Sequence, residues 1–188
     1  PGFAAYLPLT HDYEGAPDQL SIEQALQHLR PILEDAAYKK VGQNLKYDIS
    51  VMAQHGVDVK GVAFDTMLMS YVLDSTHRHD MDSMAMRFLQ HETIHFEDIA
   101  GKGAKQKTFN QIPLETAAPY AAEDADITLQ LYQYLLPQLQ KEPSLLKLFE
   151  EIEIPLLQVL SRVERNGTLI DADKLLDQSS QLGQRLTQ

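Results

Sequence analysis

The chain has 188 residues, of which 44% are hydrophobic, and it carries a formal net charge of −11. This length allows one core with an appendage, and the absence of a signal peptide or a long apolar run predicts a cytoplasmic protein with no membrane partner. The lack of cysteine excludes disulfides and thiolate metal sites, so a metal would need oxygen or imidazole ligands. The negative charge argues against direct binding of phosphates, but it is compatible with carboxylates that hold divalent cations.

The first half of the chain alternates short apolar segments with segments of helical period. Ser21 and Gln24 form a capping-box pattern at the start of one helix, and Asp65 is placed to cap another. The pattern predicts strands at residues 3–9, 38–42 and 59–64 and helices at residues 21–35, 44–56 and 66–74. Strands that alternate with helices indicate an α/β fold with parallel pairing.

The second half is predominantly helical. The loop at residues 101–107 is rich in glycine and lysine but lacks the spacing of a phosphate-binding loop, so we interpret it as a surface loop. Pro119 is expected to divide a long helix. The pattern predicts helices at residues 82–90, 113–140 and 145–166, a strand at residues 168–170 and the start of another helix.

Two aspartates fall on the apolar faces of predicted helices. Asp124 lies within an apolar stripe, and Asp48 shares a flank with Leu45 and Met52. A carboxylate that faces a core is costly unless it is paired, protonated or bound to a cation. Each aspartate could pair with a basic side chain or a backbone N–H, or both could bind cations. Tyr120, one turn before Asp124, favours cations because its hydroxyl could hold a water for attack on phosphorus.

Two short motifs carry these residues, and both resemble motifs of a known family. QNLKYD at residues 43–48 and YAAED at residues 120–124 resemble the second and third motifs of the 3′→5′ proofreading exonuclease domain of the bacterial DNA polymerase I family, the third in its tyrosine form. Five further segments resemble the same family in the same order: FDTMLMSYVLDS, RHDMDSMAMRFL, EDIAGKG, TFNQI and IEIPLLQVLSRVERNGTLID. A lone YxxxD would be weak evidence, whereas this ordered set covers essentially the whole chain.

The resemblance implies a ribonuclease-H-like fold in which four acids hold two divalent cations across the scissile phosphate. It assigns Asp48 and Asp124 as metal ligands and Tyr120 as the residue that orients the attacking water. The cations would be Mg²⁺ or Mn²⁺, with Zn²⁺ as an alternative. The substrate would be the 3′ end of single-stranded or frayed DNA, and the product a nucleoside monophosphate. The resemblance also places six residues along the DNA strand, namely Gln43, Asn44, Lys46, Tyr47, Arg78 and Phe96.

The DNA-binding assignments have simple alternatives. Phe96 could equally be a core residue, and Lys46 and Arg78 could be solvated cations. The residues from His77 to Asp82 suggest a metal cluster, but a helix cap at Asp80 or Asp82 with exposed histidines explains them more simply.

The first motif of the family, an Asp-x-Glu on a central strand, has no match before the segment at residues 3–9. Asp12-Tyr13-Glu14 has the spacing but follows that segment in a loop, so we do not assign it to the site. Both ends of the chain are expected to be cut from a longer protein. With two of four acids, the chain is expected to bind cations poorly and to hydrolyse DNA very slowly at most. Robust cleavage that Asp124→Ala abolishes would contradict this expectation.

The domain organisation also follows from the resemblance. Residues 1–142 would form an incomplete exonuclease domain that lacks its first strands, and residues 143–188 would begin the polymerase region with helices leading into its thumb. The parent would be a DNA polymerase with proofreading activity. A non-catalytic spacer domain and a related 3′→5′ ribonuclease of the same fold stay open as alternatives. The missing strands would leave an open sheet edge, so self-association is expected.

Overall fold

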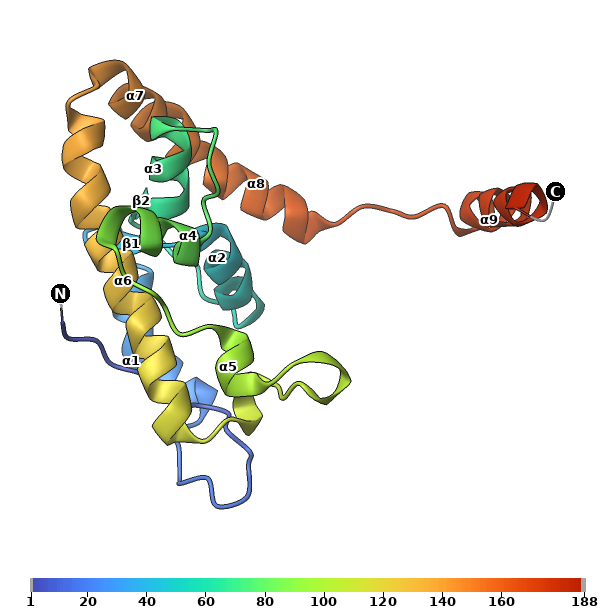
Figure 1. Ribbon diagram of the computed structural model, residues 1–188, viewed down its shortest axis with the longest axis horizontal. Helices are drawn as coiled ribbons and strands as arrows, with labels where there is room; N and C mark the ends of the chain where they lie inside the picture. Colours follow the sequence, from blue (N-terminus) through green and yellow to red (C-terminus); the bar gives the residue numbers. More distant parts are fainter. Residues whose placement is uncertain (1, 187–188) are drawn as a thin grey trace.

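The computed structural model describes residues 2–186, in which helices predominate and two short strands form a parallel sheet (Figure 1). The α-helices are α1 (Ile22–Leu33), α2 (Leu45–Gln54), α3 (Thr66–Leu73), α4 (Met81–Met84), α5 (Phe96–Ala100), α6 (Leu114–Gln140), α7 (Pro143–Leu148), α8 (Ile154–Asn166) and α9 (Ala172–Leu186). The strands are β1 (Lys40–Gly42) and β2 (Val62–Asp65). Two π-helical turns are η1 (Ala85–Leu89) and η4 (Phe149–Glu153), and two 3-10 turns are η2 (Gly103–Lys105) and η3 (Phe109–Gln111).

The parallel sheet brings the ends of β1 and β2 together. The two strands are joined through α2, and Gly42 at the end of β1 lies opposite Asp65 at the end of β2. Both strands therefore finish at the same edge of the sheet. At this edge α2 begins after the first strand and α3 begins directly after the second.

The strands predicted at residues 38–42 and 59–64 are confirmed, although each observed strand is shorter. Gly61 explains the late start of β2. Its φ is 68°, and a Cβ atom on it would lie 2.4 Å from the carbonyl oxygen of Tyr38. Only glycine tolerates a backbone oxygen at this distance, so β2 begins at the residue that follows Gly61.

The main core forms around the long helix α6, which runs along the body of the molecule in Figure 1. Its apolar face packs against α3, α4 and the two π-helical turns. The buried residues of this cluster are Met69, Met84, Ala85, Ile127, Leu131, Leu135, Leu139 and Phe149. A second cluster joins α1, α2 and α8 through Leu26, Leu45, Ile49, Val57, Val59 and Leu157. The helix α2 is therefore fixed on one flank by apolar packing, and its other flank is available to a site.

Two predicted strands are wrong. Residues 3–9 and 168–170 have the composition of strands but adopt no regular structure. A strand needs a partner, and within residues 2–186 the strands β1 and β2 pair only with each other. Leu169 is fully exposed, so the second segment also lacks a surface to pack on.

The prediction that Pro119 divides the long helix is also wrong, because α6 continues through both Pro119 and Pro137. The helix predicted at residues 145–166 is instead α7, η4 and α8 in immediate succession. The π-helical turn η4 ends two residues before Pro155, which has no N–H to bond to the carbonyl four residues earlier, within η4. The helix predicted at residues 82–90 is likewise divided between α4 and η1.

The C-terminal helix stands apart from the body. Figure 1 shows α8 leading into an extended segment and then α9 at the far end. No residue of α9 is buried. Residues 2–186 contain no helix with the length and apolar character of a transmembrane span.

Candidate functional site

Asp48 and Asp124 line the same pocket. The pocket has a volume of about 530 Å³ and lies between the end of β1, the start of α2 and the middle of α6. Its lining residues are Val41, Gly42, Gln43, Leu45, Asp48, Met81, Ala121, Asp124, Ala125 and Thr128. Residues that are 76 positions apart in sequence are thus brought to one cavity because β1, which leads into α2, packs beside α6.

Neither carboxylate has a basic partner. Among the salt bridges within residues 2–186, none includes Asp48 or Asp124. Burial raises the pKa of Asp124 to about 6, and the neighbouring charges of Glu123 and Asp82 add to the shift. Asp48 is more exposed than Asp124. Partial burial of its carboxyl still raises its pKa, against a hydrogen bond from the backbone that lowers it, and the charge of Asp65 raises it further. The pocket is therefore acidic and uncompensated, which favours a bound cation over two free carboxylates.

The turn before α2 is shaped by local sequence. Asn44 adopts the left-handed conformation, with φ 56° and ψ 47°, a region that asparagine enters more readily than most residues. Gly42 lies against Leu45, and a Cβ atom on Gly42 would lie 2.3 Å from the nearer δ-carbon of Leu45. These two residues let the chain reverse from the strand into α2 within a few positions, which sets where Asp48 lies in the first turn of that helix.

Asp65 has a role that the sequence predicted only in part. Its carboxylate caps α3 by accepting hydrogen bonds from the backbone N–H groups of Met67 and Leu68, at 3.0 and 3.3 Å, as expected. It also accepts the N–H groups of Asn44 and Leu45 at the start of α2, at 3.2 and 2.8 Å. The second role depends on the pairing of β1 with β2. The signal that could have revealed it is that parallel strands end at the same edge of a sheet.

Tyr120 and Phe96 belong to one aromatic cluster. Tyr120 lies one turn before Asp124 on α6, with its ring 6.1 Å from Phe96 and 5.9 Å from Phe109, measured between centroids. Burial raises the pKa of Tyr120, and the charge of Asp124 adds to the shift. Phe96 is half-buried and packs against Phe109 as well. It is thus part of a small core beside the pocket.

The remaining residues predicted to contact DNA are spread more widely. Gln43 lines the pocket, and Asn44 forms the turn beside it. Lys46 points away to α8, where its ammonium lies 2.5 Å from a carboxylate oxygen of Glu164. Tyr47 is 69% exposed. The guanidinium of Arg78 pairs with Asp80 at 2.9 Å, and its side chain is 84% exposed.

Two acids, Asp82 on α4 and Glu123 on α6, hold the segment before α5 in place. Asp82 accepts hydrogen bonds from the hydroxyl of Thr93 at 2.7 Å and from the ring of His95 at 3.0 Å. Glu123 contacts the ring of His91 at 2.8 Å and accepts the N–H of Ile94. Asp82 and Glu123 therefore add negative potential beside Asp124. They also fix the segment that leads into α5, which carries Phe96 of the aromatic cluster.

Of the residues from His77 to Asp82, only Met81 lines the pocket, and the histidines and acids of this segment do not. Asp80 caps α4 by accepting the N–H of Ser83 at 3.0 Å. The expectation of exposed histidines is wrong for His79, whose Nδ1 bonds to the hydroxyl of buried Ser70 at 3.0 Å and whose Nε2 is buried. Across residues 2–186, no three histidine or acidic side chains form a group that could hold a metal ion. Asp12-Tyr13-Glu14 lies in a turn and does not line the pocket.

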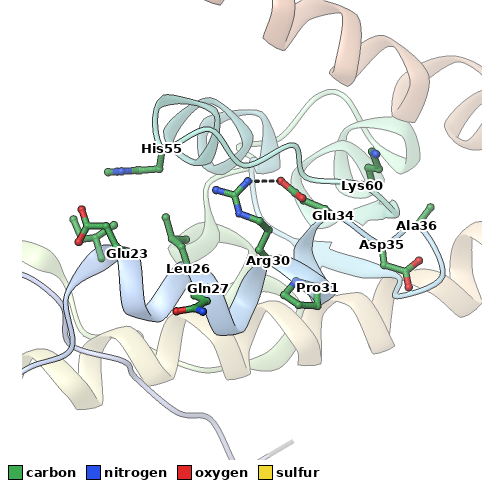
Figure 2. A pocket seen from close by; sticks show the side chains of 11 residues that line it. Glu23, Leu26, Gln27, Arg30, Pro31, Glu34, Asp35, Ala36, His55 and Lys60 are labelled. Carbon is green, nitrogen blue, oxygen red and sulfur yellow. Dashed lines mark hydrogen bonds and ion pairs between the residues drawn. The ribbon is translucent and has the colours of Figure 1, made fainter.

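A larger pocket, of about 1060 Å³, lies on α1 and is shown in Figure 2. Its charged residues are of both signs, and Arg30 and Glu34 neutralise each other at 2.8 Å. The guanidinium of Arg30 also bonds to the carbonyl of Gly56. None of the residues singled out in the sequence lines this pocket. The smaller pocket with two unpaired carboxylates is therefore the candidate site.

Comparison with known proteins identifies the family. The model of the 3′-5′ exonuclease domain of A-type DNA polymerases matches residues 6–140. The chain is 56% identical to DNA polymerase I of Pseudomonas aeruginosa over 98% of its length and 41% identical to DNA polymerase I of Rhizobium leguminosarum over 96%. The chain therefore belongs to the 3′-5′ exonuclease family of DNA polymerase I. Members of this family generally use divalent metals.

The relatives are much longer than the chain. It spans 21% of the Pseudomonas aeruginosa protein and 18% of the Rhizobium leguminosarum protein, about a fifth of each. A solved structure described as the POL domain of Pol1 from M. smegmatis, in complex with DNA primer-template and dNTP, matches 88% of the chain and 25% of that protein, with a TM-score of 0.68 and 23% identity. At this identity the match supports the α/β fold.

Proposed function

We propose that the chain is part of a proofreading DNA polymerase and carries half of the acidic site that hydrolyses the 3′-terminal phosphodiester of DNA. The observation that carries the proposal is the pairing of Asp48 and Asp124 at one pocket without a basic partner. Residues 1–142 would belong to the exonuclease domain and residues 143–188 to the start of the polymerase region. The substrate would bring the protein to the nucleoid.

The pocket fits divalent cations in its ligand chemistry. Carboxylate oxygens are the ligands that Mg²⁺ and Mn²⁺ prefer, and two of them face the pocket from different helices. When bound, such cations lower the pKa of a water and stabilise the charge on the leaving 3′ oxygen. A two-cation site of this family requires two further acids, and none of the described residues supplies them at this pocket.

The other site residues act on the water and the strand. Tyr120, one turn from Asp124, would orient the attacking water through its hydroxyl, which its raised pKa keeps protonated. Gln43 at the pocket would donate to the DNA through its amide. Asn44, Lys46, Tyr47, Arg78 and Phe96 would lie along the strand. Lys46 and Arg78 would exchange their present carboxylate partners for phosphates, and Phe96 would stack on a base.

The proposal is tested in the full-length polymerase that contains this chain. Asp48→Asn and Asp124→Asn remove one anionic ligand each without a change in size. We expect each to lower kcat for hydrolysis of single-stranded DNA with Mg²⁺ by about a hundredfold or more, because cation-assisted charge stabilisation contributes several kcal/mol. Asp126→Asn is the matched control, since Asp126 lies on α6 but not at the pocket, and it should keep the wild-type rate.

Two outcomes would count against the proposal. Wild-type rates in both pocket variants would favour a non-catalytic spacer, and a preference for RNA over DNA would favour a ribonuclease of the same fold. The 188-residue chain by itself is expected to cleave single-stranded DNA very slowly with Mg²⁺ or Mn²⁺, because its pocket has two of the four acids. Fast cleavage that Asp124→Ala abolishes would show that two acids suffice.

A further inference from the structure

Thr66 forms hydrogen bonds with the turn that leads from β1 to the pocket. It is completely buried, although it carries a hydroxyl. That hydroxyl donates to the carbonyl oxygen of Gly42 at 3.2 Å and contacts the amide oxygen of Gln43. The amide nitrogen of Gln43 in turn donates to the backbone carbonyl of His79 at 2.9 Å. The side chain of Gln43 is therefore held at both ends before any ligand arrives.

Asp65, the preceding residue, forms hydrogen bonds with the rest of the same turn. It too is completely buried, and its carboxylate accepts the N–H groups of Asn44 and Leu45. Together the adjacent pair Asp65 and Thr66 therefore contacts four consecutive residues, 42–45. Burial raises the pKa of Asp65, and hydrogen bonds from four backbone N–H groups oppose this shift without cancelling it.

The turn at residues 42–45 sets the position of Asp48. The helix α2 begins at Leu45, so Asp48 follows within its first turn. A shift of the turn would move Asp48 relative to Asp124, which α6 holds separately. Displacements of about 1 Å in a reacting group can cost about a hundredfold in rate.

We propose that Asp65 and Thr66 are positioning residues for the nuclease reaction, which hold Gln43 and Asp48 in register with Asp124 without touching substrate. This inference rests on the proposed function and extends it to residues outside the pocket, since neither Asp65 nor Thr66 lines it. A positioning role differs from a purely structural role in one respect. Loss of a positioning residue weakens cation binding even when the chain stays folded.

The test uses two substitutions of Thr66 that differ in the hydroxyl. Thr66→Val keeps the volume and removes the hydroxyl, whereas Thr66→Ser keeps the hydroxyl and removes a methyl group. In the 188-residue chain, Mn²⁺ is titrated while the backbone amide NMR signals of Asp48 and Asp124 are followed, because bound Mn²⁺ broadens nearby signals. The titration is run at a temperature at which both variants are as fully folded as the wild type.

The positioning role predicts that Thr66→Val raises the Mn²⁺ concentration needed to halve the Asp48 signal by about tenfold, the lower end of the usual effect of residues behind a metal ligand. Thr66→Ser should restore the wild-type value. In the full-length polymerase, Thr66→Val should lower kcat for DNA hydrolysis about tenfold and leave KM unchanged, as expected when a residue acts in the transition state.

The outcomes separate this inference from the proposed function. If Asp48→Asn and Asp124→Asn keep the wild-type rate in the full-length polymerase, the proposed function fails, and the inference fails with it. If those two variants lose activity while Thr66→Val keeps the wild-type Mn²⁺ response and the wild-type kcat, only the positioning role is overturned. Asp65→Asn is a second variant, because its amide replaces one accepting oxygen with a donor that faces backbone N–H groups. It should weaken Mn²⁺ broadening in the same direction, and an unchanged titration would contradict the inference.

Discussion

The carboxyl group of Asp124 should make the stability of the folded chain depend on pH. Its pKa is raised to about 6, first by burial and then by the charges of Glu123 and Asp82. In the unfolded chain the pKa returns to about 3.8, so between these values the folded chain binds more protons. The stability that Asp124 contributes without a cation is thus fully present below pH 3.8 and is lost as the pH rises through about 6.

This difference predicts a pH-dependent free energy of unfolding. In EDTA, the urea midpoint of the wild-type chain should fall more between pH 5 and pH 7 than that of Asp124→Asn, because the amide has no charge to bury. Asp126→Asn should keep the wild-type slope, and Mn²⁺ at pH 7 should raise the wild-type midpoint but not that of Asp124→Asn. Equal slopes in wild type and Asp124→Asn would contradict the raised pKa.

Gly42 is the residue at which a single methyl group should disturb the site. A Cβ atom there would lie 2.3 Å and 2.5 Å from two carbons of Leu45, whose side chain is buried. We expect Gly42→Ala to lower the free energy of unfolding by about 1 to 3 kcal/mol, as overpacking usually does. Gly183→Ala is the control, since α9 has no buried residue and the change should stay within about 0.5 kcal/mol. Urea unfolding of both variants provides the measurement, and equal stabilities would contradict the crowding at Gly42.

At the scale of elements, local signals predicted the helices well. The capping box at Ser21 and Gln24 is present, and Asp65 caps α3 as expected. These signals depend on neighbours within one turn, so the sequence contains all that they require. Asp48 and Asp124 were also found from helical period, because an acid on an apolar face is anomalous whatever it contacts, although in the structure Asp48 is exposed and Asp124 is half-buried.

Features that depend on distant partners could not be predicted. The segment at residues 3–9 has strand composition but no ladder partner within the described residues. The second cap made by Asp65 required the pairing of β1 with β2, and the packing of Phe96 against Tyr120 required the position of α5 on α6. Pro119 was misjudged because α6 gains enough from its buried face to tolerate a missing backbone hydrogen bond.

Because α6 continues through Pro119, replacing this proline should change the stability of the helix. Proline lacks the N–H that would bond to the carbonyl of Glu115, and the residue is exposed. Pro119→Ala should therefore raise the free energy of unfolding by about 1 to 2 kcal/mol, the gain of a helical bond reduced by the added freedom of the unfolded chain.

Urea unfolding measures this effect, with Pro113→Ala as the control. Pro113 caps the start of α6 and costs no intrahelical bond, so its replacement should not stabilise the chain. A loss of stability in Pro119→Ala would instead show that the proline imposes a helix geometry on which Tyr120 and its aromatic cluster depend.

At the scale of the whole molecule, the body and α9 differ in packing. The apolar residues of α9 are concentrated on one side of the helix, and none of its residues is buried. Its exposed residues include Leu175, Leu176, Leu182 and Leu186, at 52%, 66%, 59% and 87%. Such a row of exposed leucines favours association with another surface. The expected self-association through a sheet edge stays a prediction, and α9 offers an additional contact.

We therefore predict that the chain self-associates as its concentration rises, with an increase in mass by light scattering. Leu176→Glu with Leu182→Glu should reduce the association, because the charges interrupt the apolar side of α9. Gln181→Glu with Gln184→Glu adds the same charge on the opposite side of the helix and should leave the association unchanged. A monomer at all concentrations, or an equal effect of both double variants, would contradict this prediction.

The proposed site depends on one property of the molecule, which is that Asp48 and Asp124 share a cation. Titration of the wild-type chain with Mn²⁺, followed by backbone amide NMR, tests it most directly. We predict that the signals of Asp48 and Asp124 broaden together and before all others, and that Asp48→Asn or Asp124→Asn removes this effect while Asp126→Asn does not. Broadening that begins elsewhere, such as at Asp82 and His95, or that persists in both pocket variants, would contradict it.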